Sequence, residues 1–482
     1  MSQIKEMNYT QNKEVEYRST NYSRNLASEI FSRIERLPWS MLLKSSSDAH
    51  CDSRFDILVA NPVATLVTRD QITTIREMTG EKSCGNPGQK DPVKYISYQS
   101  DQDPFSLLDE IQKKWTPAIQ SERPYLPFTG GALGYFAYDL GRRIEKLPET
   151  ADHDIPLPEM AVGIYTWALI VDHQEKQAWW TGQDTQAAEA WILAQQPSPD
   201  APFQLKSCWQ SNMTRALYQN KFEAIQAYLQ AGDCYQINLT QRFQAEYRGS
   251  EWQAFNLLDQ SNEAPFSAFL RLDEGAILSL SPERFLQLKN RHIETKPIKG
   301  TIPRAEIPAD DRLQAETLRQ SPKDQAENLM IVDLLRNDIG RVALPGSVCV
   351  PKLFDIETFP YVHHLVSTIH AKLDQKYSAS DLIRACFPGG SITGAPKVRA
   401  MEIIEELEPH RRNAYCGSIG YISRNGQMDT SITIRTLIAT GQQLYVWAGG
   451  GIVADSQWKN EYQETLDKLS RILPVLRPQG TE

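Results

Sequence analysis

The sequence has few features of a secreted, membrane or nucleic-acid-binding protein. It has no block of basic residues, and its 51 Lys and Arg are outnumbered by 60 Asp and Glu, which excludes nucleic acid as a partner. The longest apolar stretch, from Met160 to Val171, is about half of what a bilayer span requires. The N-terminal segment is polar throughout and lacks the apolar core of a signal peptide. We therefore expect a cytoplasmic protein with no membrane contact.

Several common chemical motifs are also missing. The seven cysteines are scattered without a CxxC pair, a pattern typical of reduced thiols and not of a zinc knuckle or a disulfide framework. No glycine-rich turn matches a nucleotide-binding motif in its required context. His363, His364 and His370 lack HExxH spacing, and neighbouring strand residues point to opposite faces, so we do not expect them to bind a metal. No Cys-His-Glu glutaminase arrangement is visible, so any ammonia has to come from another protein.

Local patterns divide the chain into four parts. Residues 1–24 are polar and aperiodic, which predicts a disordered tail. Residues 25–180 contain short apolar runs between turn signals and are expected to be rich in strands. Residues 181–211 are rich in Gln, Ala and Pro and predict a linker or a surface excursion. Residues 212–475 mix helix and strand patterns. The pattern as a whole predicts an α/β protein with mixed sheets and helices outside.

Element boundaries are clearest in the last part. Thr214 is a good N-cap for a helix that Gly232 ends. A second helix is predicted from Ser321-Pro322 to Gly340, a third after Pro396, and a last one from about Gln457 to Leu473. Between the first two helices, CYQINLTQRF reads as a strand. Its alternation places Tyr235, Ile237, Leu239 and Phe243 on one face and Gln236, Asn238 and Thr240 on the other.

Four charged residues invite a chemical reading. Lys299, in KPIKGT, lies between two prolines that hold the segment extended; it becomes a nucleophile if a dry site lowers its pKa, but a surface lysine is the commoner case. Glu327 has apolar neighbours on its predicted helix and needs either a cation such as Mg²⁺ or an ion pair with Lys323. Glu461 and Glu464 are spaced i, i+3, which usually marks a solvated helix face.

Two glycine-rich turns and one arginine favour an anionic ligand. PGGSITGAPK leads into a helix, so its N–H groups and the helix dipole form an anion site. AGGGIV, from Ala448 to Val453, forms a second candidate nest of backbone N–H groups. Arg435, in a predicted strand with apolar neighbours, needs a carboxylate or a phosphate. These residues by themselves predict an enzyme that binds a small anion, with Mg²⁺ as a candidate cofactor.

A set of longer motifs resembles the chorismate-utilising enzymes, a family that includes anthranilate, isochorismate and salicylate synthases. The motifs are SPERF, KPIKGT, AENLMIVDLLRNDIGRV, HHLVS, FPGGSITGAPKVRAMEII, GSIGY, TSITIRTL and AGGGIVADS with EYQET. PWSMLLKS, SRFDILVANP and PFTGGALGYFAYDLGRR resemble the N-terminal part of the family, so the resemblance covers nearly the whole chain. It implies an anthranilate-synthase-like α+β fold, in which two packed β-sheets form a sandwich core with helices outside.

Two positions indicate the reaction within the family. Isochorismate and salicylate synthases have a water-activating lysine where this chain has Gln236, and glutamine has no basic form at neutral pH. Anthranilate synthases typically read PIAGT where this chain reads PIKGT. The resemblance therefore implies conversion of chorismate and ammonia to 4-amino-4-deoxychorismate, for 4-aminobenzoate and folate synthesis. Lys299 would add covalently to C2, and a separate glutaminase subunit would supply ammonia. Anthranilate synthase component I is the alternative.

The resemblance also implies roles for single residues. Glu283, in SPERF, is the expected general acid for the departing hydroxyl. Glu327 and Glu461 are the expected Mg²⁺ ligands, with Glu464 reaching the ion through water. The residues expected to bind or line chorismate are Gln236, His364, Ser391, Tyr415, Arg435, Gly449, Gly450 and Gly451.

The N-terminal part resembles the region where anthranilate synthases bind tryptophan as an inhibitor. The LLES of those enzymes reads Leu42-Leu43-Lys44-Ser45 here, without the acidic residue. The resemblance thus implies a tryptophan site at Ser45 that is structural and not inhibitory.

Overall fold

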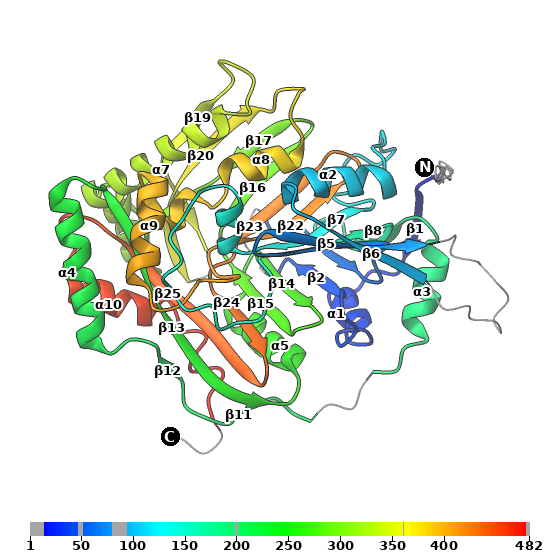
Figure 1. Cartoon of the computed structure of the whole chain (residues 1–482), viewed down its shortest axis with the longest axis horizontal. Helices are drawn as coiled ribbons and strands as arrows, with labels where there is room; N and C mark the ends of the chain where they lie inside the picture. The colour runs from blue at the N-terminus through cyan, green and yellow to red at the C-terminus, as the bar shows by residue number, and fades with distance from the viewer. Residues whose placement is uncertain (1–13, 47–51, 80–93, 198–200, 360, 479–482) are drawn as a thin grey trace.

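Two large antiparallel sheets pack face to face, with helices on their outer sides (Figure 1). The computed structural model describes residues 14–46, 52–79, 94–197, 201–359 and 361–478. This arrangement confirms the expected α+β sandwich. Among the described residues, no helix is long and apolar enough to cross a membrane.

The first sheet joins strands from both ends of the chain. Its order is β1 (Glu16–Thr20), β10 (Gln177–Gly182), β9 (Trp167–Asp172), β3 (Phe55–Val59), β2 (Met41–Lys44), β14 (Phe266–Arg271), β15 (Ala276–Ser281), β24 (Thr436–Thr440), β25 (Gln443–Ile452), β13 (Gln236–Arg248) and β11 (Gln204–Leu205). The short strands β12 (Gln210–Ser211) and β21 (Gly394–Ala395) also pair with β13.

The second sheet is built in the same way. Its order is β18 (Ile298–Pro303), β20 (Val362–Lys372), β17 (His292–Thr295), β16 (Arg284–Lys289), β23 (Met428–Ile432), β22 (Ser418–Ser423), β7 (Gly131–Phe136), β8 (Met160–Tyr165), β4 (Ala64–Arg69), β5 (Ile72–Thr79) and β6 (Lys94–Ser100), with β19 (Cys349–Thr358) paired to β20. Because β2 pairs with β14 and β7 with β22, the parts predicted as 25–180 and 212–475 share both sheets.

Ten α-helices and two 3₁₀ turns lie within the described residues, and most helices cover the outer faces. The helices are α1 (Leu26–Phe31), α2 (Pro104–Trp115), α3 (Thr185–Leu193), α4 (Arg215–Ala231), α5 (Glu251–Asn262), α6 (Pro308–Arg319), α7 (Pro322–Gly340), α8 (Ala379–Cys386), α9 (Lys397–Leu407) and α10 (Trp458–Asp467), and the turns are η1 (Tyr138–Arg143) and η2 (Gly390–Ile392). In Figure 1, α2 and α8 lie side by side at the top, and α1 and α5 lie just below β2 and β14.

Successive side chains of a strand point alternately to the two faces of its sheet, and both faces are buried here. In β3, Ile57 and Val59 enter the core between the sheets, whereas Leu58 joins a separate apolar cluster under α1, α3 and α5. The predicted caps are present as well. The side chain of Thr214 accepts a hydrogen bond from the main-chain N–H of Leu217 at the start of α4, and that of Ser321 accepts one from Asp324 at the start of α7.

Local patterns misjudged three segments. Residues 1–13 of the predicted tail lie outside the described residues, but Glu16–Thr20 pairs with β10, a partner distant in sequence. The predicted linker 181–211 contains α3, whose Ile192 is buried in the outer cluster. The last helix ends at Asp467, before the expected Leu473.

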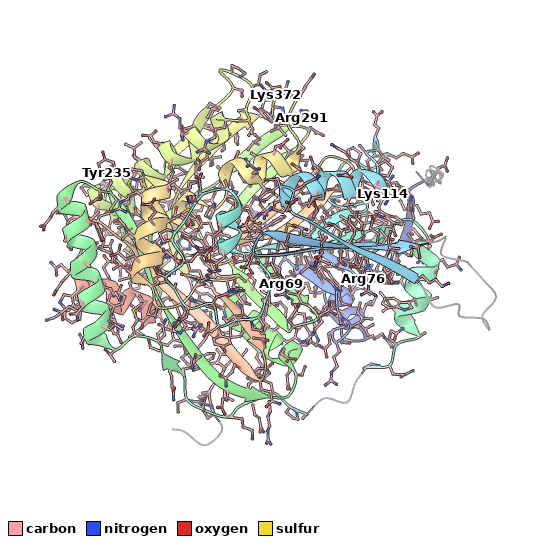
Figure 2. The ribbon with its side chains drawn as sticks, viewed as in Figure 1. Arg69, Arg76, Lys114, Tyr235, Arg291 and Lys372 are labelled. Carbon is pink, nitrogen blue, oxygen red and sulfur yellow. The ribbon has the colours of Figure 1, made fainter. Side chains whose placement is uncertain are left out.

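Tyr235 is a further correction, because it does not share the buried face of Ile237 and Leu239. It precedes β13, its side chain is 72% exposed, and Figure 2 shows it at the edge of the molecule. Its backbone N–H donates to the carbonyl of Ala395, which fixes the chain there without burying the ring.

Among the points where the chain passes directly from one sheet to the other, two lie next to each other at predicted site residues. β15 of the first sheet leads through Glu283 to β16 of the second, and β23 of the second leads through Arg435 to β24 of the first. Two hydrogen bonds connect these crossovers. The N–H of Ile432 donates to the carbonyl of Glu283 at 3.0 Å, and the hydroxyl of Ser281 donates to the carbonyl of Ile432 at 2.6 Å. Two predicted site residues thus lie where the sheets meet.

Candidate active site

Lys299 lies on the edge strand β18, opposite the η2 turn. Its ammonium donates a hydrogen bond to the main-chain oxygen of Ser391 at 3.0 Å. The side chain is half-buried, and burial lowers the pKa of Lys299, against the opposing effect of nearby carboxylates, chiefly Glu327. A lowered pKa increases the fraction of neutral amine, which is the nucleophilic form.

Gly300 makes the local geometry of Lys299 possible. β18 has an irregular register between Lys299 and Thr301, and Gly300 has a φ of +80°. A Cβ at this position would meet Asp324 Oδ1 and Leu318 Cδ1, both at 2.9 Å. Glycine therefore suits the left-handed backbone at this position, and any other residue would also displace the side chains of Asp324 and Leu318.

Glu283 lies next to Lys299 and is almost fully enclosed, with 6% of its surface exposed. Burial raises the pKa of Glu283 to about 6, while the charge of Lys299 and a hydrogen bond with the Ser391 side chain act in the opposite direction. The nearby N–H of Ile298 also acts to lower the pKa of this carboxyl group. Ser391 thus contacts both groups, with its carbonyl on Lys299 and its side chain on Glu283.

Three further carboxylates face one another across α7 and α10. Burial raises the pKa values of Glu327 and Glu461. Burial also opposes ionisation of Glu464, but the ammonium of Lys468 at 2.7 Å outweighs it and lowers the pKa of Glu464. Lys323 lies 3.8 Å from Glu327 and 3.9 Å from Glu461. The ion pair considered from spacing is therefore present, but its lysine spans two of the predicted metal ligands.

The three glycines of AGGGIV bring strand and side chains close together. A Cβ on Gly450 would lie 3.2 Å from Glu461 Oε2 and 3.4 Å from Glu464 Oε1. A Cβ on Gly451 would lie 2.3 Å from Gln236 Nε2, and one on Gly449 would lie 2.4 Å from the carbonyl of Leu239. These glycines therefore leave room for the carboxylates of α10 and the amide of Gln236.

Gln236 is the most unusual polar group of the site. It is 0% exposed, and neither its oxygen nor its nitrogen has a hydrogen-bond partner. A buried amide without partners costs on the order of 1–3 kcal/mol. Such a cost is commonly retained where a ligand supplies the missing partners.

PGGSITGAPK folds over β13 and does not form an open loop. Gly394 and Ala395 pair with Ile237 and Gln236, and a Cβ on Gly394 would lie 2.1 Å from the carbonyl of Gln236. The helix α9 follows directly from Lys397. Binding of an anion at this turn stays a prediction.

The remaining predicted residues lie on the neighbouring elements. Tyr415 is buried and stacks on Trp447, with ring centroids 5.9 Å apart. His364, on β20, exchanges a hydrogen bond of 2.8 Å with the hydroxyl of Thr301. The sequence predicted Arg435 to lie in a strand, and this was wrong. Arg435 lies in the crossover before β24, with a φ of +50°. Burial lowers the pKa of Arg435, and among the described residues no hydrogen bond or ion pair holds its guanidinium.

Sequence reasoning missed two groups beside the site. Lys468 donates to the carbonyl of Gly449 at 2.8 Å and pairs with Glu464; its i+4 spacing from Glu464 was a usable signal. Arg412 and Glu408 form a buried pair behind Ser391 and β13, and no local pattern distinguishes them from surface charges.

A separate cavity of about 90 Å³ lies between the sheets, next to Ser45. Ser45 is held there by Asp56, which accepts a hydrogen bond from its N–H at 2.9 Å. Lys44 also lines the cavity, and its ammonium pairs with Asp259 at 2.5 Å. The cavity walls include Phe266 and Tyr421. Binding of tryptophan beside Ser45 stays a prediction.

A third group of potential ligands lies elsewhere. Asp70, His153 and Glu159 each place one ligand atom within 4.8 Å of the others. They flank the turn between β4 and β5, near the end of the second sheet opposite to β18. This group is therefore distinct from the carboxylates near Lys299.

The chain is similar to known proteins in sequence and in fold. Residues 70–474 match the sequence profile of a family described as chorismate binding enzyme. The chain is 59% identical to aminodeoxychorismate synthase component 1 of Salmonella typhimurium, over 93% of this chain and 96% of that one. It is 58% identical to the protein of the same name from Escherichia coli K12, over 92% and 95%. Anthranilate synthase component I of Streptococcus pneumoniae TIGR4 has a similar structure, with a TM-score of 0.74 and 30% identity over 87% and 92%.

Proposed function

The chain belongs to the family of chorismate-binding enzymes, and from this membership we propose that it is the component of aminodeoxychorismate synthase that acts on chorismate. It converts chorismate and ammonia to 4-amino-4-deoxychorismate, in 4-aminobenzoate and folate synthesis. The observation that carries the proposal is the contact of Ser391 with both Lys299 and Glu283. The contact brings a candidate nucleophile and a candidate acid close together.

The two groups supply the two halves of the first step. The amine of Lys299 adds to C2 of chorismate, both conjugated double bonds of the ring shift by one position, and the C4 hydroxyl leaves with a proton from Glu283 as water. Ammonia then attacks C4, both double bonds shift back, and the amine of Lys299 leaves from C2. Each step is a displacement relayed through the two conjugated double bonds, and two such steps in succession retain the configuration at C4.

Gln236 and the carboxylate-binding groups direct the substrate. Gln236 lacks the basic nitrogen that would activate water, so attack at C2 is left to Lys299. Its unpartnered amide is satisfied by the substrate. Tyr415, Arg435 and the N–H groups of Gly449, Gly450 and Gly451 bind one substrate carboxylate, and His364 lines the site. Arg435 has a free guanidinium within the described part of the chain, which fits this role.

Mg²⁺ is the proposed cofactor. Glu327 and Glu461 would hold it directly and Glu464 through water, and oxygen ligands of this kind suit a hard cation. Two facts support the fit: burial raises the pKa values of Glu327 and Glu461, and Lys323 is drawn between them. Bound Mg²⁺ would neutralise a carboxylate of chorismate.

A glutaminase subunit is the proposed source of ammonia. The relatives are named component 1, which points to a second component. The five cysteines among the described residues are free thiols, which fits a protein of the reducing cytoplasm.

A structural tryptophan is proposed for the cavity at Ser45. The cavity is lined by the rings of Phe55, Phe266 and Tyr421 and by Ser45. Lys44, which replaces the acidic residue of the inhibited relatives, is engaged with Asp259, so we do not expect tryptophan to regulate activity. Titration of tryptophan into the protein, with activity recorded in parallel, tests both statements.

One incubation tests the central proposal. The purified protein is supplied with chorismate, Mg²⁺ and ammonium, and the product is identified by chromatography and mass spectrometry. The expected product is 4-amino-4-deoxychorismate, without release of pyruvate. Anthranilate together with pyruvate would establish the alternative, anthranilate synthase component I, and isochorismate would show that the role of Gln236 is wrong.

A further inference from the structure

A buried ion pair lies behind the proposed site. Arg412 and Glu408 are only 1% and 5% exposed, and the guanidinium meets the carboxylate through two contacts of 2.9 and 2.7 Å. A buried pair of this kind adds little net stability, because desolvation offsets the attraction. Stability alone therefore does not explain why Arg412 and Glu408 are buried here.

The remaining donors of Arg412 join two segments of the site. One nitrogen donates to the carbonyl of Ile392 at 2.8 Å, and another to the carbonyl of Asn238 on β13 at 2.9 Å. The guanidinium carbon also lies 4.8 Å from the ring centre of Tyr138, on η1. The planar fork of arginine fixes these directions together. Arg412 thus connects the η2 turn to β13 and to η1.

Glu408 completes the connection on the side of β13. Its Oε1 accepts hydrogen bonds from both the N–H and the hydroxyl of Thr240, each at 2.9 Å. The ion pair therefore binds two backbone groups of β13: Arg412 donates to the carbonyl of Asn238, and Glu408 accepts from the N–H of Thr240. The same strand begins at Gln236, whose amide faces the proposed substrate.

The η2 turn is the part of the site that depends on this connection. Ile392 directly follows Ser391, and both belong to the three-residue 3₁₀ turn η2, so a shift of the Ile392 carbonyl shifts this short turn. Ser391 accepts the hydrogen bond of Lys299 through its carbonyl and contacts Glu283 through its side chain. Displacement of Ile392 consequently displaces the partner of both reacting groups.

We propose that Arg412 and Glu408 are positioning residues of the reaction, which fix the Ser391 turn relative to β13 and thereby set the approach of the Lys299 amine to the substrate. The inference rests on the proposed function, since it assigns no chemistry to Arg412 itself. A misplacement of about 1 Å at a reacting group can cost on the order of 100-fold in rate.

The test is Arg412→Lys, which keeps the charge beside Glu408 but cannot reach Glu408, Ile392 and Asn238 together. We expect kcat for ammonia-dependent turnover to fall on the order of 10- to 100-fold, while KM for chorismate changes by less than about threefold. The rate at which an amine-reactive acylating reagent labels Lys299, read by mass spectrometry, should change in the same variant. Thermal unfolding is recorded for each protein.

Arg271→Lys is the matched control. Arg271 is also a buried arginine, which donates to the carbonyl and the carboxylate of Glu35. It lies at the far end of the β14–β15 hairpin from Glu283. We expect this variant to lose stability to a similar extent and to keep the wild-type kcat. Should Arg412→Lys not fold, Glu408→Gln, which keeps an oxygen for Thr240, replaces it with the same expectation.

The outcomes separate the inference from the proposed function. A wild-type kcat in the folded Arg412 or Glu408 variant overturns the inference, as does an equal loss of kcat in Arg271→Lys. Wild-type protein that forms no aminodeoxychorismate, or Lys299→Ala that retains full activity, overturns the proposed function instead.

Discussion

The ammonium of Lys299 lies 3.0 Å from the main-chain oxygen of Ser391, although 92 residues separate them in the sequence. Lys299 comes from the edge of the second sheet, and Ser391 from a turn that continues into a strand of the first. The proposed nucleophile is thus oriented from the other sheet, and several predictions depend on this arrangement.

Lys299→Ala should abolish turnover while chorismate still binds. The variant lacks the amine that forms the covalent adduct, so kcat should fall by roughly 1,000-fold or more. Calorimetric titration should still detect chorismate, because the carboxylate-binding groups remain. Lys289→Ala, at an exposed position on β16, is the control and should be fully active. Unchanged activity in Lys299→Ala would contradict the covalent mechanism.

Gly300→Ala should lower both stability and activity. The substitution imposes strain at a φ of +80° and brings a Cβ to 2.9 Å from Asp324 and Leu318. Gly346→Ala is a matched control, because Gly346 has a φ of +77° but open space around it. We expect about 1 kcal/mol of destabilisation for Gly346→Ala and about 2–4 kcal/mol for Gly300→Ala, measured by denaturant unfolding. Only Gly300→Ala should also lose activity, and equal effects of the two variants would refute the role of the contact.

Gln236→Leu should separate stability from function. The wild-type amide is buried without partners, so its replacement by an apolar side chain of similar size should leave the free energy of unfolding unchanged or raise it by about 1 kcal/mol. Activity should fall at least about tenfold, because the substrate loses the amide. A destabilised variant with normal activity would show that Gln236 serves the fold and not the substrate.

The pH dependence of kcat/KM should be bell-shaped. The reactive form of the enzyme has a neutral Lys299 and a protonated Glu283. It carries the same number of protons as the form with charged Lys299 and ionised Glu283. The fraction of enzyme in the reactive form is therefore constant between the pKa of Glu283 and that of Lys299. Activity falls below pH 6 or so, where Glu283, with a pKa of about 6, is protonated beside a Lys299 that is still charged. It falls again above the lowered pKa of Lys299, where Glu283 has no proton to give.

Glu283→Gln tests that assignment. The residual activity of this variant needs only the neutral amine, so it should rise with pH up to the pKa of Lys299, which lies below the ordinary lysine value. The limb near pH 6 should be absent. Rates between about pH 5 and pH 10 provide the measurement, and a variant that retains the acidic limb near pH 6 would exclude Glu283 as its origin.

Removal of Mg²⁺ with a chelator should stop turnover reversibly, because Glu327, Glu461 and the substrate carboxylate then repel one another. Glu461→Gln should weaken Mg²⁺ binding, measured by calorimetry, by on the order of 10- to 100-fold. Glu402→Gln, at a surface position on α9 that pairs with Arg399, should bind Mg²⁺ normally. Full activity in the presence of the chelator would remove the metal assignment.

Local sequence was sufficient for elements that depend on their own residues. The caps of α4 and α7 and the alternation along β13 from Gln236 onward follow from short-range sterics and hydrogen bonds. It failed for β1 and α3, because their stability comes from partners far away in the chain: β1 pairs with β10, and α3 packs its Ile192 against the outer face of the first sheet.

The sequence by itself determined the identity of the chemical groups and, through its motifs, the family. Lys299, Glu283, Glu327 and Glu461 are named by their motifs, but no spacing decides whether a lysine is solvated or enclosed. Tertiary structure decided that point, because desolvation and neighbouring charges depend on contacts between residues from both sheets. It also decided that Arg412 faces inward to the Ser391 turn and that Lys44 turns to Asp259. Sheet register and the two crossovers fix those positions, and both result from pairing between distant segments.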